Sequence, residues 1–288
     1  MSEKYLIIGE DSQIGSFFTR RYSDISVGTT RRREKVSHRS SGIYLNLEED
    51  LSLWAPPKGV TSAVIFTAVT SIEKCQQNPE YARFINVEKT KNLIDILHKN
   101  NIFIVFPSTN QVFNGTIPYQ KVGDTPSPQT EYGKNKLEVE NYLLINKIES
   151  SIIRFSKIIP PDYPLFQTWI TSLKQGESIH PFHDMVISPV SISFACMVIR
   201  ILLEKKLTGI FQVSADDDIS YANIAHDIGT KLGYNGSLIQ PVSWKTSDIQ
   251  LNHVPEHTTL DTTKLRNDLG IKVPDIRIII DEILEYYG

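Results

Sequence analysis

The strongest constraint on the fold of this 288-residue chain is the alternation of short apolar runs with helical patterns in its first half. The runs at 4–8, 25–30, 63–68 and 102–106 have the length of strands, and the run at 63–68 is apolar almost throughout. Continuous apolar runs are typical of parallel strands that are covered on both faces. Residues 79–100 carry apolar side chains at helical spacing. Strands that alternate with helices predict an α/β fold, a Rossmann-type doubly wound parallel sheet.

The second half has a looser pattern and predicts a smaller C-terminal α/β lobe. Helices are expected at 166–175, 193–205 and 221–233, with irregular structure at 179–189 and a strand at 209–214 that returns to the sheet. We therefore predict a dinucleotide-binding Rossmann domain at 1–160, to which 190–220 returns. Residues 161–288 are expected to form mainly a substrate-binding lobe. Ligands of such sheets bind outside the carboxyl ends of the strands.

Composition excludes several classes of protein. The 30 basic and 33 acidic residues give a net charge of −3, which argues against general nucleic-acid binding. The two cysteines lack metal-ligand spacing and are expected to be idle thiols in a reducing compartment. There is no apolar run of membrane-spanning length and no signal-peptide layout, so we predict a cytoplasmic protein without a membrane partner. His180 and His183 are interpreted as loop or pocket residues, and no metal site is expected.

A glycine turn follows the first strand, between Gly9 and Gly15. In a dinucleotide-binding unit such glycines let the backbone approach the pyrophosphate, which sits on amides at the helix N-terminus. Ser12 stands where a middle glycine is usual, so an ordinary strand-to-helix turn is the alternative. The predicted cofactor residues of this turn are Gly9, Ser12, Gln13, Ile14 and Gly15.

Arginines follow the second strand, at the place where a dinucleotide fold meets the adenosine ribose. An acidic residue there bonds the ribose hydroxyls, whereas arginine accommodates a 2′-phosphate. The strand ends without Asp or Glu, so Arg31 and Arg32 favour NADP(H) over NAD(H); a solvated basic loop is the alternative. The other predicted cofactor contacts are Asn46 and Leu47 beside the adenine, and Thr67 and Ala68 at the end of the strand at 63–68.

Tyr132 and Lys136 are four residues apart at the start of a predicted helix, and therefore lie on one face. The ammonium is expected to lower the pKa of the phenol and make Tyr132 a proton donor near neutrality. Thr109, at the end of the preceding strand, is expected to hold a substrate carbonyl, and Lys136 to bond the nicotinamide ribose. The alternative is a surface Tyr and Lys on a solvated helix face.

These motifs together resemble a known family. The segments are Gly9-x5-Gly15, 67–74, 86–90, Ser108-Thr-Asn-Gln-Val-Phe-Asn-Gly115, Tyr132-x3-Lys136 and 255–270. They are similar to those of the extended short-chain dehydrogenase/reductases, and most similar to the dTDP-4-dehydrorhamnose reductase branch. The chain departs from the branch at Ser12, at Ile192-Ser193 and at Asn110, where an Asp is usual, so no role that needs a carboxylate at Asn110 is carried over.

The resemblance implies NADPH-dependent reduction of the 4-keto group of a nucleotide-linked 6-deoxy sugar, in deoxysugar or polysaccharide biosynthesis. It implies Thr109 as the carbonyl hydrogen bonder, Tyr132 as the acid and Lys136 as its helper. A homodimer is compatible with it. The substrate contacts that we expect are Val69, Asn110 and Arg154.

Two other functions stay open at this stage. One is a nucleotide-sugar epimerase or dehydrogenase on the same scaffold. The other is a cofactor-binding regulatory subunit, like the non-catalytic β-subunit relatives of this branch that are found with methionine adenosyltransferase.

Overall fold

The computed structural model describes residues 3–37, 42–247 and 253–285. Its main sheet has seven strands in the order β10-β6-β5-β4-β1-β2-β3. Strand β1 pairs in parallel with β2 and β4, β2 pairs in parallel with β3, and β4 pairs in parallel with β5. The strand order reverses direction between β1 and β4. The predicted Rossmann-type doubly wound sheet is therefore confirmed. The strands are β1 Lys4–Ile8, β2 Ser26–Thr30, β3 Ile43–Tyr44, β4 Val60–Ile65, β5 Phe103–Thr109, β6 Ser150–Phe155 and β10 Gly209–Val213.

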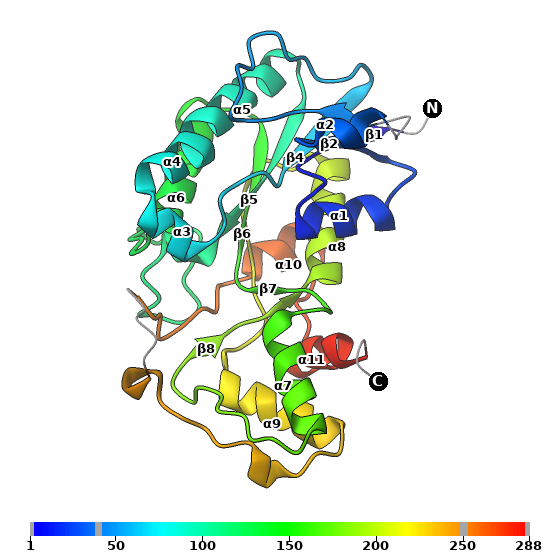
Figure 1. Ribbon diagram of the computed structural model, residues 1–288. Helices are drawn as coiled ribbons and strands as arrows, with labels where there is room; N and C mark the ends of the chain where they lie inside the picture. The colour runs from blue at the N-terminus through cyan, green and yellow to red at the C-terminus, as the bar shows by residue number, and fades with distance from the viewer. Residues whose placement is uncertain (1–2, 38–41, 248–252, 286–288) are drawn as a thin grey trace. The chain divides into compact units, whose positions relative to one another are not determined.

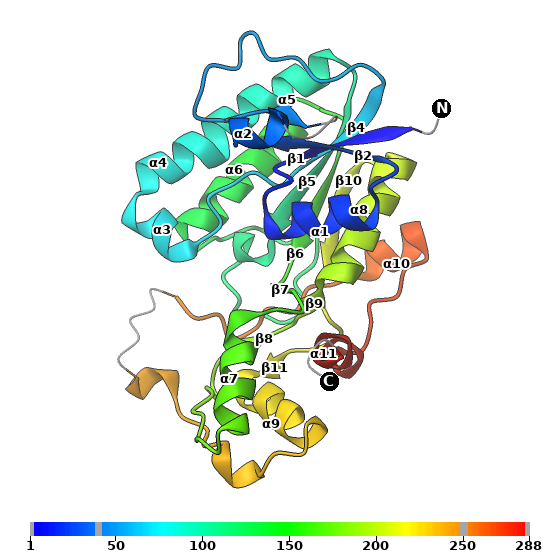
Figure 2. The same cartoon turned by 45° about the vertical axis from the view of Figure 1, so that its right-hand side comes forward.

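Helices cover both faces of this sheet (Figures 1 and 2). On one face lie α3 Ile72–Gln77, α4 Pro79–Arg83, α5 Thr90–Lys99 and α6 Glu131–Ile145, and on the other lie α1 Gln13–Arg21 and α8 Ile192–Lys205. Short helices α2 Arg33–Ser37 and η2 Asn110–Val112 follow β2 and β5. The strands are apolar on both faces because both are covered, and Leu6, Ile104 and Ile152 are fully buried in one core.

The chain divides into two compact units. One comprises residues 1–113, 126–154 and 193–211, and the other comprises 114–125, 155–192 and 212–288. The second unit has its own apolar core, which includes Phe166, Trp169 and Ile228. Its elements are β7 Ile158–Ile159, α7 Pro164–Lys174, β8 Val186–Ile187, β9 Val190–Ser191, β11 Ile219–Ser220, α9 Tyr221–Lys231, η3 Gly236–Leu238, η4 Trp244–Thr246, α10 Thr263–Leu269 and α11 Ile276–Leu284.

The first unit is interrupted at 155–192 and, earlier in the chain, between β5 and α6, where residues 114–125 belong to the second unit. The chain leaves and returns at one point, because the Ser127 amide donates to the Val112 carbonyl at 2.9 Å. This bond closes the base, or neck, of the loop that residues 113–126 form.

The helix predicted at 79–100 is not one regular α-helix. Between α4 and α5, residues Phe84–Lys89 form a π-helical segment, η1. Asn86 in this segment is buried, and its amide accepts from Val69 N at 2.7 Å and donates to Val69 O at 2.9 Å. These two hydrogen bonds fix the chain that follows β4. A π-turn widens the helix locally, and sequence periodicity does not reveal it.

Two shorter differences concern strands. The sequence Tyr44-Leu-Asn-Leu47 predicts a third short strand, but strand β3 is Ile43–Tyr44, and Leu47 instead lies in the core of the first unit at 3% exposure. The region 179–189, expected to be irregular, contains the two-residue strand β8. Within the described ranges, no helix is long and apolar enough to cross a membrane.

Candidate active site

The turn between β1 and α1 is built for close approach of the backbone. Gly9 has φ +86°, and a Cβ added to Gly15 would lie 2.4 Å from the Gly9 carbonyl oxygen, so both positions require glycine. Ser12 caps α1, since its hydroxyl donates to Gly9 O at 2.8 Å and accepts from Gly15 N at 3.0 Å. The amides of Gln13 and Ile14 lie in the first helical turn, where N–H groups have no intrahelical acceptor. This arrangement fits a dinucleotide pyrophosphate.

The carboxyl ends of β1 and β4 lie against each other. A Cβ added to Gly9 would come within 2.6 Å of Thr67 Oγ1, so the glycine leaves room for that side chain. Thr67, Ala68 and Val69 are partly exposed beyond β4. The predicted cofactor residues of these two segments are therefore neighbours at one edge of the sheet.

The carboxylate of Asp11 lies at the end of β2, although Asp11 is far from this strand end in the sequence. The Thr30 hydroxyl donates to Asp11 Oδ2, so a residue of the glycine turn stands at the end of the strand. Arg31 and Arg32 follow it with exposed side chains. The strand end itself lacks an acidic residue, as the sequence indicates, and only the pairing of turn and strand brings Asp11 there.

The residues predicted to flank the adenine follow β3. The Asn46 side chain accepts from Glu48 N at 3.1 Å and so shapes the turn. The Leu47 side chain is packed in the core, and a contact between this residue and an adenine stays a prediction.

Helix α6 begins directly against the loop that follows β5. The Thr130 hydroxyl accepts from Gly133 N at 3.0 Å and donates to Gln111 Oε1 at 2.8 Å. A Cβ at Gly133 would lie only 2.2 Å from the Gln111 carbonyl oxygen. Thr109, at the end of β5, accepts from Gln111 N at 3.2 Å through its hydroxyl. Gln111 therefore links the strand end that carries Thr109 to the helix start that carries Tyr132.

Lys136 is buried one turn after Tyr132. Its ammonium donates to the Pro107 carbonyl at 2.7 Å, and it lies 4.5 Å from the centre of the Phe106 ring and 5.9 Å from that of Tyr132. The alternative of a solvated Lys at this position is wrong, since Lys136 is 5% exposed. Burial lowers the pKa of Lys136 to about 8, against the opposing effect of the Glu140 carboxylate.

The predicted pKa shift of Tyr132 has the wrong direction. Burial raises the pKa of this phenol well above its usual value, with a further increase from the neighbouring Cys75 thiol. Lys136 does not reverse this shift, because its ammonium is itself desolvated and directed at Pro107 O. Tyr132 therefore keeps its proton at neutral pH, as a proton donor must. Such a phenol can hydrogen-bond the oxygen of a carbonyl on which negative charge develops.

A buried ion pair between Glu140 and Arg154 packs beneath the start of α6 and the end of β5. Glu140, one turn after Lys136 on α6, accepts from Arg154 Nη2 at 2.7 Å and from Nε at 3.1 Å. It also accepts from the Ser108 hydroxyl at 2.5 Å. The side chains of Arg154 and Glu140 are 3% and 1% exposed. The pair joins β6, α6 and the end of β5.

Two of the predicted substrate residues, Arg154 and Asn110, belong to the first unit. The Arg154 guanidinium is engaged by Glu140 and lies 5.0 Å from the centre of the Phe113 ring. Asn110 is partly exposed, and its Oδ1 lies 3.4 Å from Thr109 Oγ1. Their contacts with a substrate stay predictions. Glu140 lies on α6 and Arg154 on β6, so only the packing of these two elements reveals the pair.

Both cysteines are buried, as expected for idle thiols. Burial raises the pKa of Cys75 and raises that of Cys196 to about 12, which disfavours the reactive thiolate. In the part of the chain that the structure describes, no group of three or more His, Cys, Asp or Glu side chains is placed to hold a metal ion.

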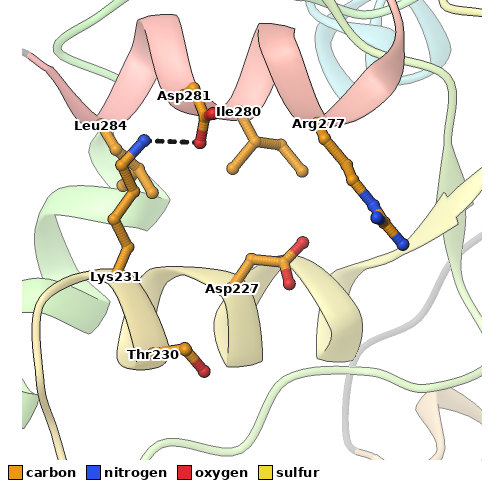
Figure 3. A pocket seen from close by; sticks show the side chains of 7 residues that line it. All are labelled: Asp227, Thr230, Lys231, Arg277, Ile280, Asp281 and Leu284. Carbon is orange, nitrogen blue, oxygen red and sulfur yellow. Dashed lines mark hydrogen bonds and ion pairs between the residues drawn. The ribbon is translucent and has the colours of Figure 1, made fainter.

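A pocket of about 230 Å³ lies in the second unit, between α9 and α11 (Figure 3). Lys231 and Asp281 form an ion pair at 2.5 Å. Burial raises the pKa of Asp227, against the opposing effect of Arg277. None of the predicted site residues lines it. The lining residues are Asp227, Thr230, Lys231, Arg277, Ile280, Asp281 and Leu284.

Two curated relatives share about a quarter of their aligned residues with this chain. The probable low-salt glycan biosynthesis reductase Agl14 of Haloferax volcanii is 25% identical, over 73% of this chain and 72% of its own length. The methionine adenosyltransferase 2 subunit beta of Bos taurus is also 25% identical, over 73% of this chain and 65% of its own length.

Solved structures share the fold over almost the whole chain. A hypothetical dTDP-4-dehydrorhamnose reductase from Sulfolobus tokodaii is 27% identical with a TM-score of 0.78, covering 95% of this chain and 98% of its own. The dTDP-4-dehydrorhamnose reductase of Bacillus anthracis, solved in complex with NADP, is 19% identical with a TM-score of 0.80, covering 99% of both chains.

The family model described as RmlD substrate binding domain matches residues 3–288. The match therefore includes the glycine turn, β5 with Thr109, the start of α6 and the whole second unit. The chain belongs to the RmlD substrate-binding-domain family and is an oxidoreductase of the extended short-chain dehydrogenase/reductase type.

Proposed function

We propose that this protein is an NADPH-dependent reductase of the 4-keto group of a nucleotide-linked 6-deoxy sugar, acting in the cytoplasm in deoxysugar or polysaccharide biosynthesis. The observation that carries the proposal is the start of α6, where a phenol that keeps its proton stands one turn from a buried ammonium. The family match over 3–288 and the reductases among the relatives support the substrate class.

In this proposal the chain's own residues bind the dinucleotide and deliver a proton. Gly9, Gly15 and the first-turn amides of α1 hold the pyrophosphate, and Arg31 and Arg32 the 2′-phosphate. The reduced nicotinamide, when bound, supplies a hydride to the carbonyl carbon. Tyr132 gives its phenolic proton to the carbonyl oxygen, which Thr109 hydrogen-bonds, so that the ketone becomes an alcohol. Lys136 bonds the nicotinamide ribose and keeps a positive charge near the phenolate that remains.

A screen of nucleotide-linked 4-ketosugars with NADPH and NADH side by side tests this function. We expect stoichiometric oxidation of NADPH with a 4-keto-6-deoxy sugar nucleotide. Net consumption separates a reductase from an epimerase, since an epimerase returns its hydride. Purified protein that oxidises neither dinucleotide with any such substrate would contradict the proposal.

A second candidate is a regulatory subunit, which is favoured by the 25% identity to the methionine adenosyltransferase 2 subunit beta. Co-purification with a partner enzyme, together with absence of turnover in the same screen, would support it. The aligned part spans 65% of that subunit.

The alkaline limb of the pH profile is expected to report Lys136. The ammonium form bonds the ribose and attracts the phenolate, and the pKa of Lys136 is about 8. Because kcat/KM reflects ionisations of the free enzyme, it should be constant below this pH and fall as the pH rises through it. The measurement is kcat/KM from pH 6 to 10 for wild type and Lys136→Met, whose low activity should lack this limb.

The free energy of unfolding is expected to rise with pH in the range where kcat/KM falls. The pKa of Lys136 is about 8 in the folded protein and 10.5 in an ordinary environment. Between these values the unfolded chain binds more protons than the folded one, so the contribution of Lys136 to stability rises with pH in this window and is lost as the pH falls through 8. Urea unfolding of wild type and Lys136→Met at both ends of the window isolates this contribution. An equal pH dependence in both proteins would contradict it.

A further inference from the structure

Asp11 has a fixed place at the carboxyl end of β2. The Thr30 hydroxyl donates to Asp11 Oδ2, and the same hydroxyl accepts from the Arg32 amide at 3.1 Å. Thr30 thus ties the glycine turn to the first residues after the strand. Asp11 is partly buried, whereas Arg31 and Arg32 are exposed.

The backbone fixes this place independently of the Asp11 side chain. Gly9 N donates to Thr29 Oγ1 at 3.0 Å and Glu10 N donates to Thr29 O at 3.0 Å, so the turn runs along the end of β2. Gly28 leaves room for the Glu10 side chain, because a Cβ there would lie 1.8 Å from Glu10 Oε2. Substitution of Asp11 is therefore expected to leave the turn in place.

We infer that Asp11 is a specificity-determining residue that opposes the 2′-phosphate of NADP(H) and favours the ribose hydroxyls of NAD(H). The inference rests on the proposed function, in which the turn between β1 and α1 binds the dinucleotide. In dinucleotide folds the adenosine ribose meets the end of the second strand, where a carboxylate accepts from its hydroxyls. The Thr30 hydroxyl orients the Asp11 carboxylate at this strand end, and a carboxylate has about four acceptor sites.

The preference between NADP(H) and NAD(H) then depends on the opposing effects of the arginines and of Asp11. Arg31 and Arg32 attract a phosphate, but exposed charges act through water and are screened by salt. Asp11 lies deeper, where the effective dielectric constant is lower and each charge acts more strongly. The preference for NADPH is consequently smaller than the two arginines alone would produce.

The test is calorimetric binding of NADPH and NADH to wild type and Asp11→Asn, without any substrate. We expect the ratio of NADPH affinity to NADH affinity to rise about tenfold in Asp11→Asn, the order expected for removal of one charge near a phosphate at the protein surface. The gain should shrink as salt is raised. The matched control is Asp24→Asn, which removes the same charge before β2; its backbone carbonyl, not its carboxylate, accepts from Lys4.

Two further variants keep the outcome clear. Asp11→Ser should raise the ratio as Asp11→Asn does, and thermal melts verify that both fold. Thr30→Val, which keeps the carboxylate but removes its donor, should raise the ratio less. An unchanged ratio in the Asp11 variants, with wild type binding a dinucleotide, overturns this inference and leaves the proposed function standing. Wild type that binds neither dinucleotide overturns both.

Discussion

Tyr132→Phe is expected to lower turnover by about 10²- to 10⁴-fold, the range attributed to general acid catalysis, while dinucleotide affinity changes little. The substitution removes the phenolic proton and nothing of the ring that packs at the start of α6. Burial keeps the pKa of Tyr132 high, so in the wild type this proton is present throughout the neutral range. NADPH oxidation with a 4-ketosugar nucleotide measures turnover, and calorimetry measures NADPH binding.

The matched control is Tyr142→Phe, on the same helix. The Tyr142 hydroxyl donates to Asp95 at 2.5 Å, on the partly buried surface of α6, and its removal should leave turnover near that of wild type. Equal losses of turnover and NADPH affinity in Tyr132→Phe would indicate a structural role for Tyr132. Full activity of this variant would refute the assigned proton donor.

Arg154→Met is expected to destabilise the protein by about 3–5 kcal/mol, the cost of leaving one partner of a buried ion pair uncompensated. The Glu140 carboxylate is 1% exposed and would keep only the Ser108 hydroxyl among the partners described above. Urea unfolding of the variant and wild type at pH 7 measures the difference. Arg200→Met serves as control, because Arg200 and Glu204 form an exposed pair at 3.1 Å and such pairs contribute about 0–1 kcal/mol.

The double variant Glu140→Leu/Arg154→Met distinguishes the charge from the packing. Replacing both members of a buried pair by apolar residues of similar volume is often close to neutral, so most of the loss should be recovered. A single Arg154→Met variant that costs no more than Arg200→Met would show that the pair is not the support described here.

The sheet could be predicted from the sequence because its strands are short runs with dense apolar residues. Ile104 and Val64 are fully buried from both sides, and burial on both faces leaves a continuous apolar signal. The π-helical segment could not be predicted, since it depends on the hydrogen bonds between Asn86 and Val69. The helical spacing of apolar residues does not indicate that Asn86 bonds the Val69 backbone.

The residue types of the candidate site could be predicted from the sequence. The burial and the pKa values of these residues could not. The spacing of Tyr132 and Lys136 places them on one face, but the direction of the pKa shift depends on how deeply the fold buries each group. Glu140 and Asp11 act through partners distant in sequence, Arg154 and Thr30. Only tertiary packing reveals these pairs.

The hydrogen bond from Ser127 N to Val112 O closes residues 113–126 into a loop whose two ends lie in the first unit. The threonine of β5 and the tyrosine of α6 sit on either side of this neck, and the residues between its ends belong to the other unit. Changes within 114–125 are therefore expected to act on the second unit, where the Gly115 carbonyl accepts from His257 N and the Gln120 carbonyl accepts from Asp261 N, while the closed loop keeps the threonine and the tyrosine together in the first unit.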